Sequence, residues 1–186
     1  MKTVNLSEVR DKIKSLVQEA NFEIQDDVLK ILKEMKENEE SPAGQTIFDQ
    51  ILENANIAKE EKLGLCQDTG LAVFFVELGE EVELNRADGM GSLKEAIEKG
   101  VIAGYEEGYL RNSVVEDPIR RKNTGDNTPA YIHWELVPGD AFKVTFVAKG
   151  GGAENMSAVR MFAPAAGQEG IEDFVVETAD KGGSNP

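Results

Sequence analysis

The sequence has very little cysteine and histidine, with one residue of each, Cys66 and His133, in 186. A single cysteine excludes an internal disulfide framework, and alone it cannot supply all the ligands of a structural zinc ion or an iron–sulfur cluster. A thiolate nucleophile needs a nearby base, and the only histidine lies in a segment that alternates like a strand. We interpret His133 as a strand-face residue and not as a partner of Cys66.

Positive charge is also scarce. Lys and Arg total 20 against 35 Asp and Glu, which gives a formal charge of -15 and a pI near 4.5. Nucleic acid and anionic membrane surfaces are therefore poor partners, since both are bound through clustered Lys and Arg. A dianionic substrate would be repelled at long range unless local cations reverse the field. The candidate cations are Arg111, Arg120, Arg121, Lys122 and Lys149.

Long hydrophobic runs are absent as well. No apolar stretch approaches the roughly 20 residues that span a bilayer. The first residues form a charged amphipathic segment with no apolar signal core. We therefore expect a cytoplasmic protein without membrane contact. A chain of this length can bury a hydrophobic core without disulfides or structural metal ions.

Helical periodicity dominates the first third of the chain. Apolar side chains recur at helical spacing over 5–20, and a second stripe follows Asp26 or Asp27. Ser41 and Pro42 have the residue types of an N-cap and a first helical position, so they predict the start of a third helix. These features predict a helical bundle over about residues 1–62.

Strands are indicated further along. The apolar run 71–78 is typical of a strand buried on both faces, and 92–108 returns to a helical pattern. Residues 131–137 and 142–148 predict two strands joined as a hairpin through Pro138-Gly139-Asp140. Residues 171–179 fit either a strand or a helix.

The predicted class is therefore α+β. A helical part, about 1–62, is followed by an α+β part, about 63–186, with a mixed or antiparallel sheet and covering helices. The predicted hairpin argues against a purely parallel sheet.

Two segments carry candidate functional groups. Cys66-Gln67-Asp68-Thr69-Gly70 precedes the first predicted strand. A lone cysteine is most often a small buried hydrophobe, but polar neighbours in a strand-entry loop also fit a functional thiol. Arg111 follows the predicted helix 92–108. There it would either interact favourably with the helix dipole or bind a carboxylate through bidentate hydrogen bonds.

Two further segments are rich in glycine and asparagine. Residues 123–130, Asn-Thr-Gly-Asp-Asn-Thr-Pro-Ala, have the composition of a turn before a strand. Residues 149–155, Lys-Gly-Gly-Gly-Ala-Glu-Asn, could bring backbone N–H groups close to an anion. The second segment lacks the spacing of a P-loop or a dinucleotide fingerprint.

Taken in order, these segments resemble the α-subunit, or N-terminal domain, of class I fumarases and tartrate dehydratases. Besides the segments already quoted, the likeness includes Ser41-Pro42 leading into Ile51-Leu52-Glu53-Asn54-Ala55. It spans most of the chain from about residue 41 onward.

The resemblance implies a hydro-lyase with a [4Fe–4S] cluster held by three cysteines, in which one iron acts as a Lewis acid without redox change. It implies that Cys66 is the first cluster ligand. Gln67 and Asp68 would contact the substrate, and Asp68 would also take part in catalytic proton transfer. Arg111 would bind a substrate carboxylate, and Gly152 would offer a backbone donor.

The family pattern continues with a second cluster cysteine directly after Gly-Ser-Asn-Pro, whereas this sequence stops at Gly183-Ser184-Asn185-Pro186. We therefore expect a truncated chain that lacks the remaining ligands and is inactive alone, with the cluster absent. The family's base comes from a β-subunit or C-terminal domain, so that partner and a homo- or hetero-oligomer are also expected.

Fumarate hydration to malate, a reaction of the tricarboxylic acid cycle, is the expected activity because it is the commoner one. L-tartrate dehydration is the first alternative, since both substrates are four-carbon dicarboxylates. A non-catalytic binding or regulatory module on the same scaffold is the second alternative.

Overall fold

The structure is a computed structural model that describes residues 2–86 and 89–183. It contains two compact units, Met1–Lys149 and Gly150–Pro186. The expected truncation point after Pro186 lies outside the described residues. Within the part of the chain that the structure describes, no helix combines the length and apolar composition needed to cross a bilayer.

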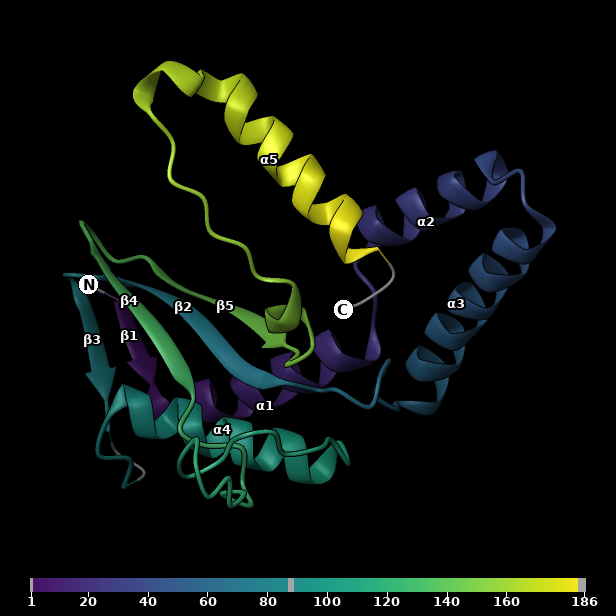
Figure 1. The fold of residues 1–186 in the computed structure, drawn as a ribbon. Coiled ribbons are helices and arrows are strands. Elements are labelled where there is room, and N and C mark those ends of the chain that lie inside the picture. The colour runs from purple at the N-terminus through teal and green to yellow at the C-terminus, as the bar shows by residue number, and fades with distance from the viewer. Residues whose placement is uncertain (1, 87–88, 184–186) are drawn as a thin grey trace. The chain divides into compact units, whose positions relative to one another are not determined.

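A three-stranded mixed sheet forms the centre of the first unit (Figure 1). Its middle strand is β2 (Leu71–Gly79). β4 (Tyr131–Val137) runs parallel to β2 on one side, and β5 (Phe142–Lys149) runs antiparallel on the other. This sheet, together with the N-terminal helices, confirms the predicted α+β class.

The predicted hairpin between β4 and β5 is wrong, because β2 lies between the two strands. The connection of residues 138–141 passes over the end of β2, where the Gly79 N–H donates to the Ala141 carbonyl at 2.7 Å. A Cβ on Gly79 would lie 2.3 Å from the Gly139 carbonyl oxygen, so this crossing requires glycine. Residues 138–140 do form a short connection between the strands. The strand inserted between them lies about 60 residues earlier in the chain, so the residues around the turn do not indicate its position.

One face of the sheet is covered by two helices, α1 (Leu6–Phe22) and α4 (Leu93–Glu107), which pack against each other. The approach is close at Gly100, where a Cβ would lie 2.6 Å from the Ile13 Cβ and 2.7 Å from the Arg10 carbonyl oxygen. The apolar stripe of α1 is therefore used against α4 and the sheet. Beside these layers, β1 (Lys2–Asn5) and β3 (Val82–Asn85) pair in parallel.

β2 is buried on one face only, which corrects the expectation of two buried faces. Phe74 is fully buried among the helices and contacts Phe146 of β5, whereas Phe75 is 48% exposed on the opposite face. The His133 ring stacks on Phe75 with centroids 4.8 Å apart, on that same face. His133 is thus a strand-face residue, as predicted.

The second and third helices do not bundle with α1, so the predicted bundle is wrong. α2 (Asp26–Asn38) and α3 (Pro42–Glu61) lie side by side as a helical hairpin (Figure 1). Ser41 is the N-cap of α3, as predicted, and its hydroxyl accepts from the Gly44 N–H. α2 has no buried residue. The apolar residues of the pair that stay exposed include Val28, Ile31, Met35, Ile47 and Ile51.

The second unit contains two short 3-10 helices, η1 (Ala153–Met156) and η2 (Pro164–Ala166), and the helix α5 (Gly167–Gly182). The residues that were ambiguous in the sequence, 171–179, are helical. Glu177 of α5 pairs with Arg160 at 2.7 Å, which ties the helix to the segment before it.

Candidate active site

Cys66 lies in the loop between α3 and β2, residues 63–70, which we call the Cys66 loop. Two helices hold its start: the Leu65 N–H donates to the Asn21 carbonyl of α1 at 2.8 Å, and the Asn54 amide of α3 donates to the Leu65 carbonyl at 2.9 Å. Because the next residues leave the helical surface, Cys66, Gln67 and Asp68 are all exposed.

The thiol is therefore not the small buried hydrophobe that a lone cysteine usually is. Its Sγ accepts a hydrogen bond from the Asp68 backbone N–H at 3.4 Å. An exposed sulfur in a loop is accessible to a metal ion or cluster that it could bind as a ligand.

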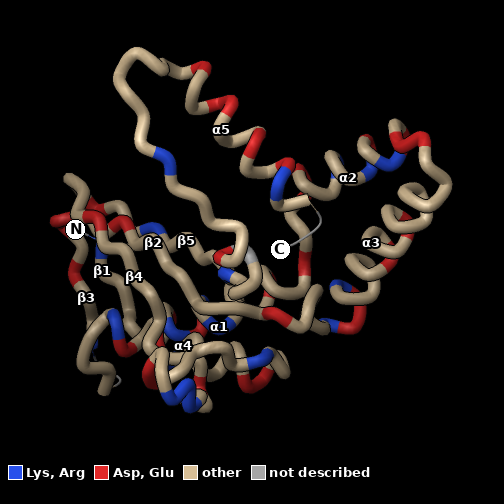
Figure 2. Tube along the Cα trace, in the orientation of Figure 1, with Lys and Arg blue, Asp and Glu red and all other residues tan. Residues whose placement is uncertain are grey.

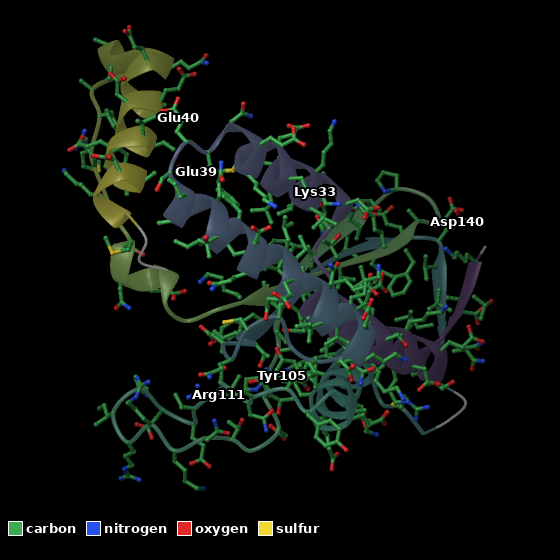
Figure 3. The ribbon with its side chains drawn as sticks, turned by 90° about the vertical axis from the view of Figure 1, so that its right-hand side faces the viewer. Lys33, Glu39, Glu40, Tyr105, Arg111 and Asp140 are labelled. Carbon is green, nitrogen blue, oxygen red and sulfur yellow. The ribbon has the colours of Figure 1, made fainter. Side chains whose placement is uncertain are left out.

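Arg111 lies in the segment that follows α4, residues 109–115, which we call the Arg111 segment. The Thr69 hydroxyl donates to the Arg111 carbonyl at 2.7 Å, so the Cys66 loop and this segment are joined next to both functional side chains. The guanidinium itself is exposed. In Figure 3, Tyr105 and Arg111 lie on the same side of the first unit. Thr69 connects them, because its carbonyl accepts from the Tyr105 hydroxyl and its own hydroxyl donates to the Arg111 carbonyl.

One cavity of about 320 Å³ lies where the two segments meet. It brings together Cys66, Gln67 and Arg111, which are three of the site residues predicted from the sequence. The lining also includes Gly64, Thr69, Tyr109 and Leu110. A thiol, an amide and a permanent cation thus face a space that could take a small anion.

Two buried side chains, those of Asn127 and Tyr105, hydrogen-bond to the segments that line the cavity. Asn127 is fully buried, and its amide bonds to both segments. The Tyr105 hydroxyl lies 2.9 Å from the Thr69 carbonyl oxygen and 3.1 Å from that of Gly70, so it donates into the Cys66 loop. Burial raises the pKa of the Tyr105 phenol above its usual range, against the effect of the nearby Asn127 amide, and the charge of Asp68 adds to the rise. Tyr105 therefore remains a neutral donor at physiological pH.

Sequence reasoning gave no role to Tyr105, Tyr109 or Asn127. Tyr105 reads as an ordinary core residue of the helical stripe in α4, and Asn127 as one of several turn residues. Tyr109 is 91% exposed with a φ of 52°, and an exposed aromatic directly after a helix is the one signal that could have marked it.

Asp126 also belongs to the loop before β4. Its burial would raise the carboxyl pKa, but hydrogen bonds from the Thr128 N–H and hydroxyl outweigh this, so the pKa of Asp126 lies below its ordinary value. The carboxylate therefore stays ionised and serves the loop as an acceptor.

The other predicted residues lie elsewhere. Asp68 is exposed on the Cys66 loop but does not line the cavity. Gly152 belongs to the second unit, at the N-cap of η1, where its carbonyl accepts from the Asn155 N–H at 3.1 Å.

The other candidate cations lie exposed in the loop after the Arg111 segment: Arg120, Arg121 and Lys122. Figure 2 shows Lys and Arg gathered in the loop that follows α4. Lys122 pairs there with Glu116 at 2.7 Å.

Among the described residues, no group of three His, Cys, Asp or Glu side chains could hold a metal ion. Cys66 fits the role of one cluster ligand, since its sulfur is exposed and faces the cavity. The described residues thus offer one thiolate of the three that the resemblance implies.

Comparison with known proteins identifies the family. The sequence model described as "Fumarate hydratase (Fumerase)" matches residues 10–186. The chain therefore belongs to the class I fumarate hydratase and tartrate dehydratase α family, which confirms the resemblance seen in the sequence.

Individual relatives carry the tartrate name. A protein of Methanocaldococcus jannaschii named "Putative L(+)-tartrate dehydratase subunit alpha" is 35% identical over 184 residues, covering 96% of this chain and 63% of the relative. The "L(+)-tartrate dehydratase subunit alpha" of Escherichia coli strain UTI89 is 32% identical over 156 residues, covering 82% of this chain and 50% of the relative. The chain thus spans between half and two thirds of the length of these relatives.

Proposed function

We propose that this chain is part of the α-subunit of a cytoplasmic, [4Fe–4S]-dependent hydro-lyase that acts on a four-carbon dicarboxylate. The observation that carries the proposal is the shared cavity of Cys66 and Arg111, in which a soft metal ligand and a carboxylate-binding cation face the same space. The active complex would include a β-subunit that supplies the base.

Each side chain has a role that its chemistry supports. Cys66 would be the cluster ligand, and the cluster when bound would supply a Lewis acid for the substrate hydroxyl. Arg111 would orient one carboxylate by two parallel hydrogen bonds, and Gln67 would add an amide contact. Asp68 would hold or pass a proton near the leaving hydroxyl. Gly152, which the resemblance implies as a backbone donor, belongs to the second unit and has no assigned place at this cavity.

The local cation also answers the electrostatic problem of a chain with a formal charge of -15. A dianion is repelled at long range by such a field, but at contact distance one guanidinium in a partly enclosed cavity outweighs distant, screened carboxylates. Binding should therefore become stronger at moderate ionic strength, because salt screens the long-range repulsion more than the contact.

L(+)-tartrate is the preferred substrate of this proposal, because the relatives named above are tartrate dehydratase α-subunits. Fumarate hydration is the second candidate, since the family description names fumarate hydratase. L-tartrate and malate, the hydroxy acids of the two reactions, differ in one hydroxyl group, and a site that hydrogen-bonds that hydroxyl would discriminate strongly between them.

The test uses the full-length chain together with its β-subunit, reconstituted with iron and sulfide without oxygen. We expect cluster absorbance, loss of water from L-tartrate, and slower conversion of malate or fumarate. Cys66→Ser should remove most of the absorbance, and Arg111→Gln should raise KM far more than it lowers kcat.

Arg120→Gln is the matched control, because it removes an exposed arginine from the neighbouring loop. It should leave KM within about twofold, as expected for a surface charge without a specific contact. A wild-type complex that binds no cluster under these conditions would overturn the proposal.

A further inference from the structure

The amide of Asn127 joins the two segments that carry the functional side chains. Its Oδ1 accepts from the backbone N–H groups of Ser113 at 2.6 Å and Val114 at 3.1 Å, both in the Arg111 segment. Its Nδ2 donates to the Gly70 carbonyl of the Cys66 loop at 3.1 Å. One buried side chain therefore bonds to both of the segments that supply the cavity lining.

Asparagine is the side chain that these contacts require. An amide offers an acceptor on one side and a donor on the other, whereas a carboxylate of the same shape offers acceptors only. The φ of 58° at Asn127 lies in the left-handed region, which asparagine tolerates better than most residues. Removing the amide would leave the Ser113 and Val114 N–H groups to find other partners, whereas the Gly70 carbonyl would keep the Tyr105 hydroxyl.

Thr69 makes a second, independent link between the same segments. Its hydroxyl donates to the Arg111 carbonyl at 2.7 Å, and the residue is 5% exposed. The two links are neighbours, because they involve Thr69 and Gly70 in the Cys66 loop and residues 111–114 in the Arg111 segment. Together they fix the end of the Cys66 loop against the Arg111 segment close to the functional groups.

We propose that Asn127, supported by Thr69, is a positioning residue that sets the separation of the Cys66 thiol and the Arg111 guanidinium. This inference rests on the proposed function, since the separation would decide how a dicarboxylate fits between the cluster ligand and the cation. Asn127 itself is fully buried and is not among the residues that line the cavity, so it need not touch the substrate.

The test measures the thiol directly. In the cluster-free full-length chain with its β-subunit, Cys66 is alkylated with iodoacetate, an anion, or with iodoacetamide, which is neutral. Peptide mass spectrometry follows the Cys66 peptide. A guanidinium near the sulfur attracts the anionic reagent, so the ratio of the two rates reports on the position of Arg111 relative to Cys66.

The Arg111→Gln variant gives the ratio of the iodoacetate rate to the iodoacetamide rate in the absence of the cation. We expect this ratio to be about three- to tenfold lower than in the wild type, as for one charge acting through partly solvated surroundings. Asn127→Gly, which tolerates the positive φ, should lower the ratio most of the way to that value. Thr69→Val, which keeps the shape and removes the hydroxyl, should lower it by a smaller factor.

Asn21→Ala is the matched control. Asn21 is also buried, at 6% exposure, and its side-chain amide donates to the Val17 carbonyl of its own helix. Its contact with the Cys66 loop uses the backbone carbonyl, which alanine keeps. It should lose stability as the other variants do and keep the wild-type ratio. Should Asn127→Gly fail to fold, Thr69→Val carries the test.

Two results would overturn the inference. One is a wild-type ratio in the folded Asn127→Gly and Thr69→Val variants while Arg111→Gln lowers it. The other is an unchanged ratio in Arg111→Gln, because the cation would then lie too far from the thiol to be positioned against it. Failure of the proposed function is seen separately, as missing cluster absorbance and turnover in the reconstituted wild type.

Discussion

Two helical pairs in the first unit use similar sequence patterns in opposite ways. α1 and α4 bury their apolar stripes against each other and the sheet, whereas α2 and α3 have regular apolar stripes that remain largely exposed. Periodicity predicts that a helix has an apolar face, but it does not specify what covers that face. The two pairs differ in the surface available for packing. For α1 this surface is formed by the sheet and by α4, whose glycines allow a close approach.

The largest test of this comparison is a pair of isoleucine truncations. Ile97 of α4 is fully buried, and Ile31 of α2 is 53% exposed. Ile97→Ala should lower the free energy of unfolding by about 2–5 kcal/mol, because it leaves a cavity. Ile31→Ala should change it by less than about 1 kcal/mol. Urea unfolding of the two variants decides this, and equal losses would contradict the packing described here.

The loss of stability at alkaline pH tests the burial of Tyr105, which lies near the end of α4. Burial raises the folded-state pKa of Tyr105, so above pH 10 the unfolded chain loses the phenolic proton first and stability falls as pH rises. The slope from this group should approach about 1.4 kcal/mol per pH unit. Urea unfolding between pH 9 and pH 11 should show a weaker dependence of stability on pH in Tyr105→Phe than in the wild type, and an equal dependence in both would contradict this assignment.

The N-caps of the two pairs should respond differently. The Ser92 hydroxyl accepts from the Glu95 N–H at 3.1 Å in α4, and that of Ser41 accepts from the Gly44 N–H at 3.4 Å in α3. Each Ser→Ala change should weaken its helix by about 1 kcal/mol. For Ser92 the loss should appear in global unfolding, because α4 is part of the core. For Ser41 it should appear as faster amide exchange in α3, and a global loss there would show that the hairpin unfolds with the core.

The smallest effects concern ion pairs. Lys14 and Glu107 connect α1 to α4 at 2.8 Å, and Lys36 with Asp49 connects α2 to α3. Glu107→Gln and Asp49→Asn should each lower stability by about 0.2–1 kcal/mol, and the loss should shrink in high salt. Thermal melts at low and high salt measure it. A loss that persists in high salt would indicate that a pair is shielded from solvent.

Local signals predicted the elements better than their arrangement. Ser41-Pro42 marked the start of α3 correctly because capping chemistry lies within one turn. The position of β2 between β4 and β5 was missed because it depends on hydrogen bonds between residues about 60 positions apart. The exposure of Phe75 was missed for a similar reason, since an apolar run does not reveal whether both faces of its strand are buried.

The candidate site divides in the same way. Cys66, Gln67 and Arg111 could be singled out from their residue types and their order, and the structure brings these three to one cavity. Asn127 could not, because its importance comes from bonds to Gly70 and Val114, and the spacing in the chain says nothing about either contact.

The crossing of the β4–β5 connection over the end of β2 has a consequence for the order of events during synthesis. Neither neighbour of β2 exists until the ribosome has made residues 131–149, so the central strand leaves the exit tunnel with both edges unpaired. A local hairpin would form within microseconds of its synthesis, whereas this sheet must wait for contacts of high sequence separation. Until then α1 and α4, which are complete by residue 107, are the elements able to shelter the apolar face of β2.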